Sequence, residues 1–113
     1  MTQKTRKGKE RKDAVRGRQK EREQHYLDKS KGIQISYTVE LDKQGEVVNY
    51  SLAYIDPTAF TGDNARVLGY DNQHGYHHRH YFGEVTAIEY TGYDERVELF
   101  EKEFWELYYE YHG

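Results

Sequence analysis

Apolar and polar residues alternate strictly in two neighbouring segments of the chain. In IQISYTVEL (33–41) every odd position is apolar or aromatic and every even position is polar. The run EVVNYSLAYI (46–55) alternates again, and the DKQG between the two runs supplies turn residues. A period of two is the signature of a strand with one buried face. The two runs therefore predict an antiparallel hairpin.

Two further strands are expected after a loop. The segment RVLGYD (66–71) forms a short third strand, in which Gly69 permits a bulge or a close backbone approach. A fourth strand begins at residue 76, directly after a glycine turn, and runs on to residue 90 with a break near Gly83. Alternation also places neighbouring residues of this strand on opposite faces of the sheet.

The C-terminal segment changes period, and it predicts a helix that ends near Gly113. Asp94 occupies the expected N-cap position, and glutamates fill the polar face. Apolar side chains recur at spacings of three and four and form one stripe: Val97, Phe100, Phe104, Leu107, Tyr108 and Tyr111. The fold class is therefore α+β, a small antiparallel four-stranded sheet covered by one C-terminal helix.

The N-terminal segment differs from the rest of the chain in charge. Residues 1–31 carry 12 Lys and Arg against 5 Asp and Glu, net +7, whereas residues 32–113 carry net −10. Almost no apolar side chain is available there, so we expect 1–16 to be disordered and 17–28 to be disordered or marginally helical. The chain thus divides into a basic arm (1–31) and an α+β domain (32–113). Such an arm suits phosphates or an acidic protein face, although a purely solvated arm is an alternative.

Composition excludes several classes of protein. The chain has no cysteine, so it contains neither a disulfide framework nor a thiolate metal site. No apolar run approaches the roughly 20 residues that span a bilayer, and the N-terminus lacks the apolar segment of a secretory signal. We expect a cytoplasmic protein with no membrane partner and no cofactor.

Candidate chemistry gathers in YDNQHGYHHRHYFG (70–83), which contains four of the six histidines. Its tyrosines and phenylalanine are explained by packing, because aromatic residues replace aliphatic ones throughout this chain. Packing does not explain the histidines, because each buried ring nitrogen needs a hydrogen-bond partner. Two interpretations of the histidines therefore remain, metal binding and acid–base chemistry.

A metal site is one interpretation. His78 and His80 lie two positions apart on one strand face, the spacing of His-x-His zinc and iron sites, and His74 offers a third imidazole. Asp71 or Glu84 offers a carboxylate. No ligand outside the segment is identifiable, so this interpretation is the weaker one.

Acid–base cleavage of RNA is the other interpretation. Imidazole titrates near neutral pH, so His78 and His80 can supply a base for the 2′-hydroxyl and an acid for the departing 5′-oxygen. Asp71 can orient an imidazole through its second nitrogen. Arg79 is the candidate phosphate contact, but a regular strand points it to the opposite face. The cation would then come from a bulge, from Arg66 or from the basic arm.

Aromatic residues beside the histidines are candidate substrate contacts. Tyr70, Tyr76 and Tyr81 can stack on unpaired bases, although core packing gives the same pattern. Asn72 is either a substrate contact or, more simply, a turn residue with a left-handed backbone.

The same segment resembles the TumE family, the toxin half of toxin–antitoxin pairs. The residues that carry the resemblance are Tyr70, Asp71, Asn72, Gly75, His78, Arg79 and His80. The resemblance covers about 33–112. It implies a small cytoplasmic toxin of a type II pair that acts on RNA or translation and is masked by a cognate DNA-binding antitoxin. The basic arm and the additional His74 and His77 depart from the family pattern.

The leading hypothesis is an RNA-directed toxin, a metal-independent endoribonuclease. His78, His80 and Asp71 are its expected catalytic residues, and the arm guides it to RNA or the ribosome. A non-enzymatic module that binds nucleic acid or protein through the arm is the alternative. A metal-dependent enzyme that uses the histidines is the third possibility. Exposed strand edges leave a homodimer open.

Overall fold

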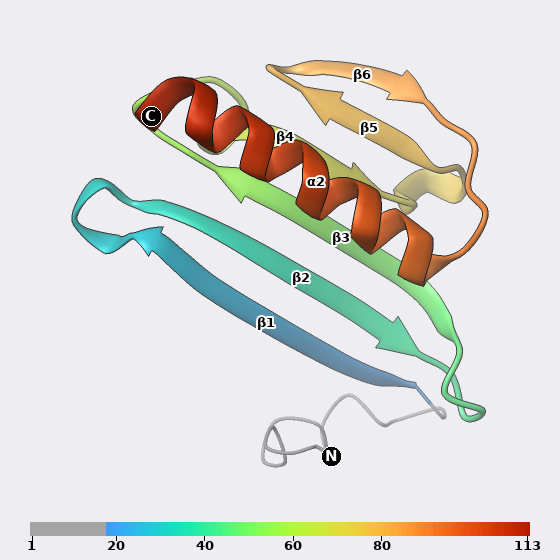
Figure 1. The fold of residues 1–113 in the computed structure, drawn as a ribbon. Coiled ribbons are helices and arrows are strands. Elements are labelled where there is room, and N and C mark those ends of the chain that lie inside the picture. Colours follow the sequence, from blue (N-terminus) through green and yellow to red (C-terminus); the bar gives the residue numbers. More distant parts are fainter. Residues whose placement is uncertain (1–17) are drawn as a thin grey trace.

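The computed structural model describes residues 18–113. These residues form a six-stranded antiparallel sheet in the order β1-β2-β3-β4-β5-β6, and the helix α2 lies across one face (Figure 1). The elements are β1 Gln19–Asp28, β2 Ile33–Leu41, β3 Val47–Ile55, β4 Arg66–Asp71, β5 His78–Tyr81, β6 Glu84–Ala87 and α2 Tyr93–His112. The α+β class is confirmed, but the sheet has six strands and not four.

The first additional strand is β1. The expectation of disorder or a marginal helix for residues 17–28 is wrong for Gln19–Asp28, which pairs along the whole of β2. Its side chains are mostly polar because it is an edge strand, and its hydrogen bonds to β2 need no apolar pattern. The disorder expected for 1–16 lies outside the described residues. The division at residue 31 marks a change of charge, and it is not the edge of the sheet.

The second additional strand arises from the break near Gly83. Phe82 and Gly83 both have positive φ, 48° and 86°, and they connect β5 to β6 as a tight hairpin turn. The single strand expected over 76–90 therefore folds back on itself. The short, exposed strand β6 becomes the second edge of the sheet.

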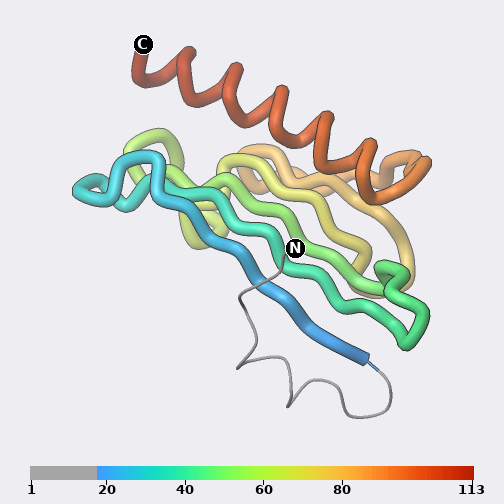
Figure 2. Tube along the Cα trace, turned by 60° about the horizontal axis from the view of Figure 1, so that its bottom comes forward, coloured from blue at the N-terminus to red at the C-terminus, as the bar shows by residue number. Residues whose placement is uncertain are grey.

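The core lies between α2 and the sheet. The predicted stripe of α2 is buried through Phe100, Phe104 and Leu107. The helix contacts β3 and β4, and Figure 2 shows that it covers only one side of the sheet. Its N-cap is Gly92 and not the expected Asp94. The buried sheet residues of this core include Ile33, Ile35, Tyr50, Leu52, Tyr54, Leu68 and Tyr70. Within residues 18–113 no helix is long and apolar enough to cross a membrane.

Buried Asp56 ties the end of β3 to the end of α2. Its carboxylate accepts hydrogen bonds from Tyr54 Oη at 2.8 Å, Thr58 Oγ1 at 2.6 Å and His112 Nε2 at 2.6 Å. Burial by itself would raise the pKa of Asp56, but the hydrogen bonds from Thr58, His112 and Tyr54 outweigh it and lower that pKa. The fully buried charge is thus compensated inside the fold.

Candidate functional site

Asp71, His78 and His80 lie on the face of the sheet opposite α2. Residues that pair directly across an antiparallel ladder share a face, and the register pairs Asp71 with His78 and Gly69 with His80. The polar uncovered face therefore carries the three expected catalytic residues. We call these three residues the Asp71–His cluster.

Asp71 lies between the two imidazoles. His78 Nε2 is 2.8 Å from Asp71 Oδ1, and His80 Nε2 is 3.0 Å from Asp71 Oδ2. The ring centroids of His78 and His80 are 4.9 Å apart. The prediction that Asp71 can orient an imidazole fits this geometry for both rings.

Arg66 brings a guanidinium to the cluster. Its Nη2 lies 3.1 Å from His80 Nδ1, and its Nη1 lies 4.0 Å from Asp71 Oδ2. Asp63 holds the same guanidinium through two hydrogen bonds of 2.9 and 3.1 Å. A Cβ atom at Gly69 would come within 2.7 Å of Arg66 Cδ, so the glycine leaves room for this side chain. Arg66 is one of the three cation sources that the sequence allowed.

The hydrogen-bond partners indicate which ring nitrogens accept and which donate. Arg66 can only donate, so Nδ1 of His80 accepts and Nε2–H donates to Asp71. Burial and the charge of Arg66 lower the pKa of His80, which favours this neutral form. In His78 both nitrogens face oxygen acceptors, because Nδ1 lies 3.2 Å from the carbonyl oxygen of Tyr76. Each nitrogen of His78 is thus placed to donate, Nε2 to Asp71 and Nδ1 to the Tyr76 carbonyl.

The cluster is largely buried, on the face of the sheet opposite α2. The exposed fractions of its side chains are 7% for Asp71, 5% for His78 and 12% for His80. The Tyr76 ring lies 4.7 Å from the His78 ring and is itself well exposed. Of the three candidate stacking tyrosines, Tyr76 is therefore the one beside the cluster.

Three other expected contacts lie across the sheet, under α2. Arg79 forms an ion pair with Glu103 of α2, donates from Nε to Tyr70 Oη at 3.0 Å, and lies over the Tyr81 ring at 4.5 Å. The inference that Arg79 points away from the histidines is confirmed. Arg79, Tyr70 and Tyr81 thus join the sheet to the helix, and they do not meet the Asp71–His cluster.

Asn72 completes the pairing between β3 and β4. Its Oδ1 accepts from the backbone N–H of Tyr50 at 3.0 Å, and its Nδ2 donates to the carbonyl of Val48 at 3.0 Å. Its φ of −118° is not left-handed, so that part of the expectation is wrong. The side chain takes the place of a backbone partner at the end of β4.

The two additional histidines do not join the cluster either. His74 is exposed and takes a positive φ of 65° in the turn before β5. His77 stacks on Tyr90 with a centroid distance of 3.9 Å, and its Nδ1 lies 2.9 Å from Tyr50 Oη. Burial, with a smaller effect of Arg96, lowers the pKa of His77. Its contacts are those of a packing residue.

The donor set of the cluster also suits a divalent metal ion. Two imidazoles and one carboxylate have ligating atoms within 4.8 Å of one another, the set used by some iron and zinc sites. A metal bound at Nε2 of both rings requires both atoms to be unprotonated. The bond from Arg66 places the His80 proton on Nε2, and a guanidinium beside Asp71 opposes a dication. In the present arrangement the two Nε2 atoms face Asp71 as hydrogen-bond partners.

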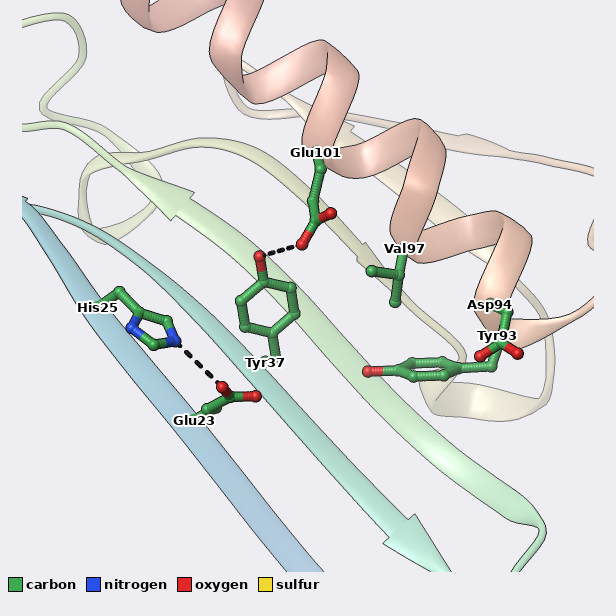
Figure 3. A pocket seen from close by; sticks show the side chains of 7 residues that line it. All are labelled: Glu23, His25, Tyr37, Tyr93, Asp94, Val97 and Glu101. Atoms are coloured by element: carbon green, nitrogen blue, oxygen red, sulfur yellow. Dashed lines mark hydrogen bonds and ion pairs between the residues drawn. The ribbon is translucent and has the colours of Figure 1, made fainter. Parts of the chain in front are cut away.

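A separate pocket of about 360 Å³ lies on the helix side, between β1 and the first half of α2 (Figure 3). Glu23, Asp94 and Glu101 give it a negative charge. Tyr37 Oη donates to Glu101 at 2.6 Å, and burial together with that carboxylate raises the pKa of Tyr37. Carboxylates repel phosphate groups, so this side of the sheet is unsuited to RNA.

The family model described as Toxin TumE matches residues 6–107, most of the chain. The chain belongs to the TumE toxin family. Its role is therefore that of a toxin, and the resemblance carried by residues 70–83 is confirmed. Comparisons with curated proteins and with solved structures gave no match.

The extent of the TumE match corrects one expectation about the arm. The arm was expected to depart from the family pattern, but the match begins at residue 6 and includes β1. Most of the basic segment of this TumE toxin therefore falls within the family model.

Proposed function

We propose that this TumE toxin is a metal-independent endoribonuclease and that the Asp71–His cluster is its proton-transfer site. The observation that supports this most directly is one carboxylate shared by two imidazoles, with a guanidinium at the same point. A toxin family implies an antitoxin partner. A type II pair with a DNA-binding antitoxin, a cytoplasmic location, and RNA or the ribosome as target belong to this proposal.

In this mechanism His80 is the base. A phosphate oxygen of the substrate takes over the hydrogen bond from Arg66 Nη2, which releases the Nδ1 lone pair of His80. Nδ1 then accepts the proton of the ribose 2′-hydroxyl, and that oxygen attacks the adjacent phosphorus. Asp71 keeps the Nε2–H bond and stabilises the imidazolium that forms.

His78 is the acid. Its Nδ1–H donates to the Tyr76 carbonyl, and movement of the turn before β5 would redirect that proton to the leaving 5′-oxygen. The P–O5′ bond breaks as the proton arrives, leaving a 2′,3′-cyclic phosphate and a 5′-hydroxyl. Arg66 offsets the charge of the phosphorane oxygens. Arg66 thus takes the role of phosphate contact that was expected for Arg79. Arg79, Tyr70 and Tyr81 instead position β5 against α2. Tyr76 stacks on a base of the substrate.

A metal-dependent enzyme is the second candidate, because the three ligating atoms of the cluster converge. Elemental analysis of the purified protein distinguishes the two candidates. Near-stoichiometric zinc, iron or manganese, together with loss of cleavage on chelation and its recovery with that metal, would replace the first candidate with the second.

A homodimer through the β1 or β6 edge stays a prediction.

The test compares RNA cleavage and growth arrest for His78→Gln, His80→Gln and the double variant. His25→Gln is the matched control, since His25 is an exposed residue of β1 on the helix side of the sheet, outside the cluster. We expect a loss of cleavage of about 10²–10⁴-fold for each cluster variant and none for the control. Growth arrest that persists in the double variant at equal expression would overturn the mechanism and favour the non-enzymatic binding module.

A further inference from the structure

A row of polar residues crosses the uncovered face of the sheet. The register pairs each residue of this row with the next: Arg22, Thr38, Ser51, Asp71 and His78. Neighbouring strands lie about 4.8 Å apart, so Arg22 on β1 is about 14 Å from Asp71 on β4. The candidate catalytic cluster is therefore one end of a continuous polar track.

β1 separates its charges between the two faces of the sheet. Alternation places Arg18, Lys20 and Arg22 on the uncovered face, and Glu21 and Glu23 on the helix side. Lys20 and Arg22 are exposed, and within residues 18–113 neither has a carboxylate in salt-bridge contact. The far end of the polar track is therefore positively charged.

A pocket of about 400 Å³ lies along this track, beside the cluster. Lys20, Thr38, Asn49, Ser51 and Gln73 contribute to its wall. The backbone N–H of Gln73 donates to Asp71 Oδ1 at 3.1 Å, which links the wall directly to the cluster. The hydroxyls of Thr38 and Ser51 make no hydrogen bond with any residue of 18–113, so they are available to a ligand.

One carboxylate also lines this pocket, and it is partly neutralised. Glu40 is 3.5 Å from the guanidinium of Arg18 and accepts a hydrogen bond of 2.6 Å from Asn49 Nδ2. The Glu40–Asn49 pair thus offers an acceptor and donors side by side, as a base edge requires.

We propose that this pocket binds the nucleoside next to the cleaved phosphodiester and that a single-stranded RNA crosses the sheet from the Asp71–His cluster to Lys20 and Arg22. This inference rests on the proposed function. The pocket is in the size range of small-ligand sites, and its wall combines hydroxyl and amide groups with Val39, Tyr50 and His74. The two cations meet the backbone phosphates, and exposed Tyr76 stacks on a base at the other end.

The test measures binding of a single-stranded 2′-deoxy oligonucleotide, which lacks the attacking hydroxyl, to the full chain at several salt concentrations. For Lys20→Gln with Arg22→Gln we expect binding at least about tenfold weaker at low salt. The slope of log K against log salt should fall by about 1.4, because each phosphate contact of a single strand contributes about 0.7. Lys43→Gln with Lys102→Gln removes the same charge from the β2–β3 turn and from α2, and it should leave the slope unchanged.

A second variant tests the pocket without changing charge. Thr38→Val with Ser51→Ala should weaken binding by about fivefold for each lost hydrogen bond and leave the salt slope as it is. Thermal melting verifies that each variant is folded. Unchanged binding in this variant, or an unchanged slope in the Lys20 and Arg22 variant, would overturn the inference.

The two proposals can fail separately. If the wild type cleaves RNA through His78 and His80 but the Lys20 and Arg22 variant binds as the wild type does, the pocket assignment is wrong and the proposed function stands. If that variant loses binding while His78→Gln with His80→Gln still cleaves, the proton-transfer site is wrong and the binding face stands.

Discussion

Arg66 donates a hydrogen bond from Nη2 to Nδ1 of His80 at 3.1 Å, across the space that Gly69 leaves open. The bond fixes the tautomer of His80 and brings a guanidinium to Asp71 at 4.0 Å. Arg66 and His80 are 14 positions apart in the chain, and the pairing of β4 with β5 brings them together.

Removing the charge of Arg66 should move the pH profile of cleavage. Burial and Arg66 lower the pKa of His80 from its ordinary value of about 6.5. The base acts in its neutral form, so activity rises as pH climbs through that pKa, and the wild-type limb should lie below about pH 6.5. Arg66→Gln should shift the limb to higher pH and lower the maximal rate. An NMR titration of the His80 ring measures the same shift without substrate, and an unmoved pKa would contradict the prediction.

Gly69→Ala should displace Arg66 without removing its charge. The new Cβ would lie 2.7 Å from Arg66 Cδ and 3.2 Å from the carbonyl oxygen of Leu52, so the flexible arginine must shift. We expect lower cleavage and a loss of about 1–3 kcal/mol in the free energy of unfolding. The control is a double-mutant cycle: in an Arg66→Gln background the alanine should have little further effect on cleavage. Full additivity of the two effects would show that Gly69 does not act through Arg66.

The packed His77 side chain should make the free energy of unfolding depend on pH, although His77 lies outside the Asp71–His cluster. Its folded pKa is lowered, so its contribution is fully present above the unfolded value of about 6.5 and is lost as pH falls through the folded pKa. His77→Phe keeps the ring stacked on Tyr90 but removes the titration. Urea unfolding at about pH 7 and pH 5 measures the free energy of unfolding at each pH. The difference between the two values should be smaller in this variant than in the wild type. At pH 7 the variant should lose about 1 kcal/mol, because the Tyr50 hydroxyl loses its acceptor.

The comparison for that experiment is His74→Phe, at an exposed position of the turn. It should keep the wild-type pH dependence. An equal flattening of the pH dependence in both variants would remove His77 as its source.

Deletion of residues 1–17 should reduce the salt dependence of RNA association. This segment carries 7 Lys and Arg against 2 Asp and Glu, and its removal leaves β1 in place. Deletion up to residue 31 would instead remove an edge strand. We expect weaker association with long RNA and a smaller salt slope, with cleavage of a short oligonucleotide retained. Association that survives with the same salt dependence would show that the arm does not guide the toxin.

Periodicity along the chain determined the central hairpin, the third strand and the helix. The alternation in 33–41 and the stripe through Phe100 and Phe104 are local patterns, because each depends on which face of one element is buried. The same alternation established that His78 and His80 share a face and that Arg79 does not. The strand β1 gave no such signal, since an edge strand with two solvated faces needs only backbone pairing with β2.

The tertiary structure decided the contents of the candidate site. Asp71 meets both imidazoles because the β4–β5 register sets it opposite His78, and a shift by one residue would send its side chain to the helix face. Arg66 reaches His80 only because Gly69 has no side chain in its path. Registers between strands and the space above a glycine are properties of pairs of segments, so a pattern within one segment cannot specify them.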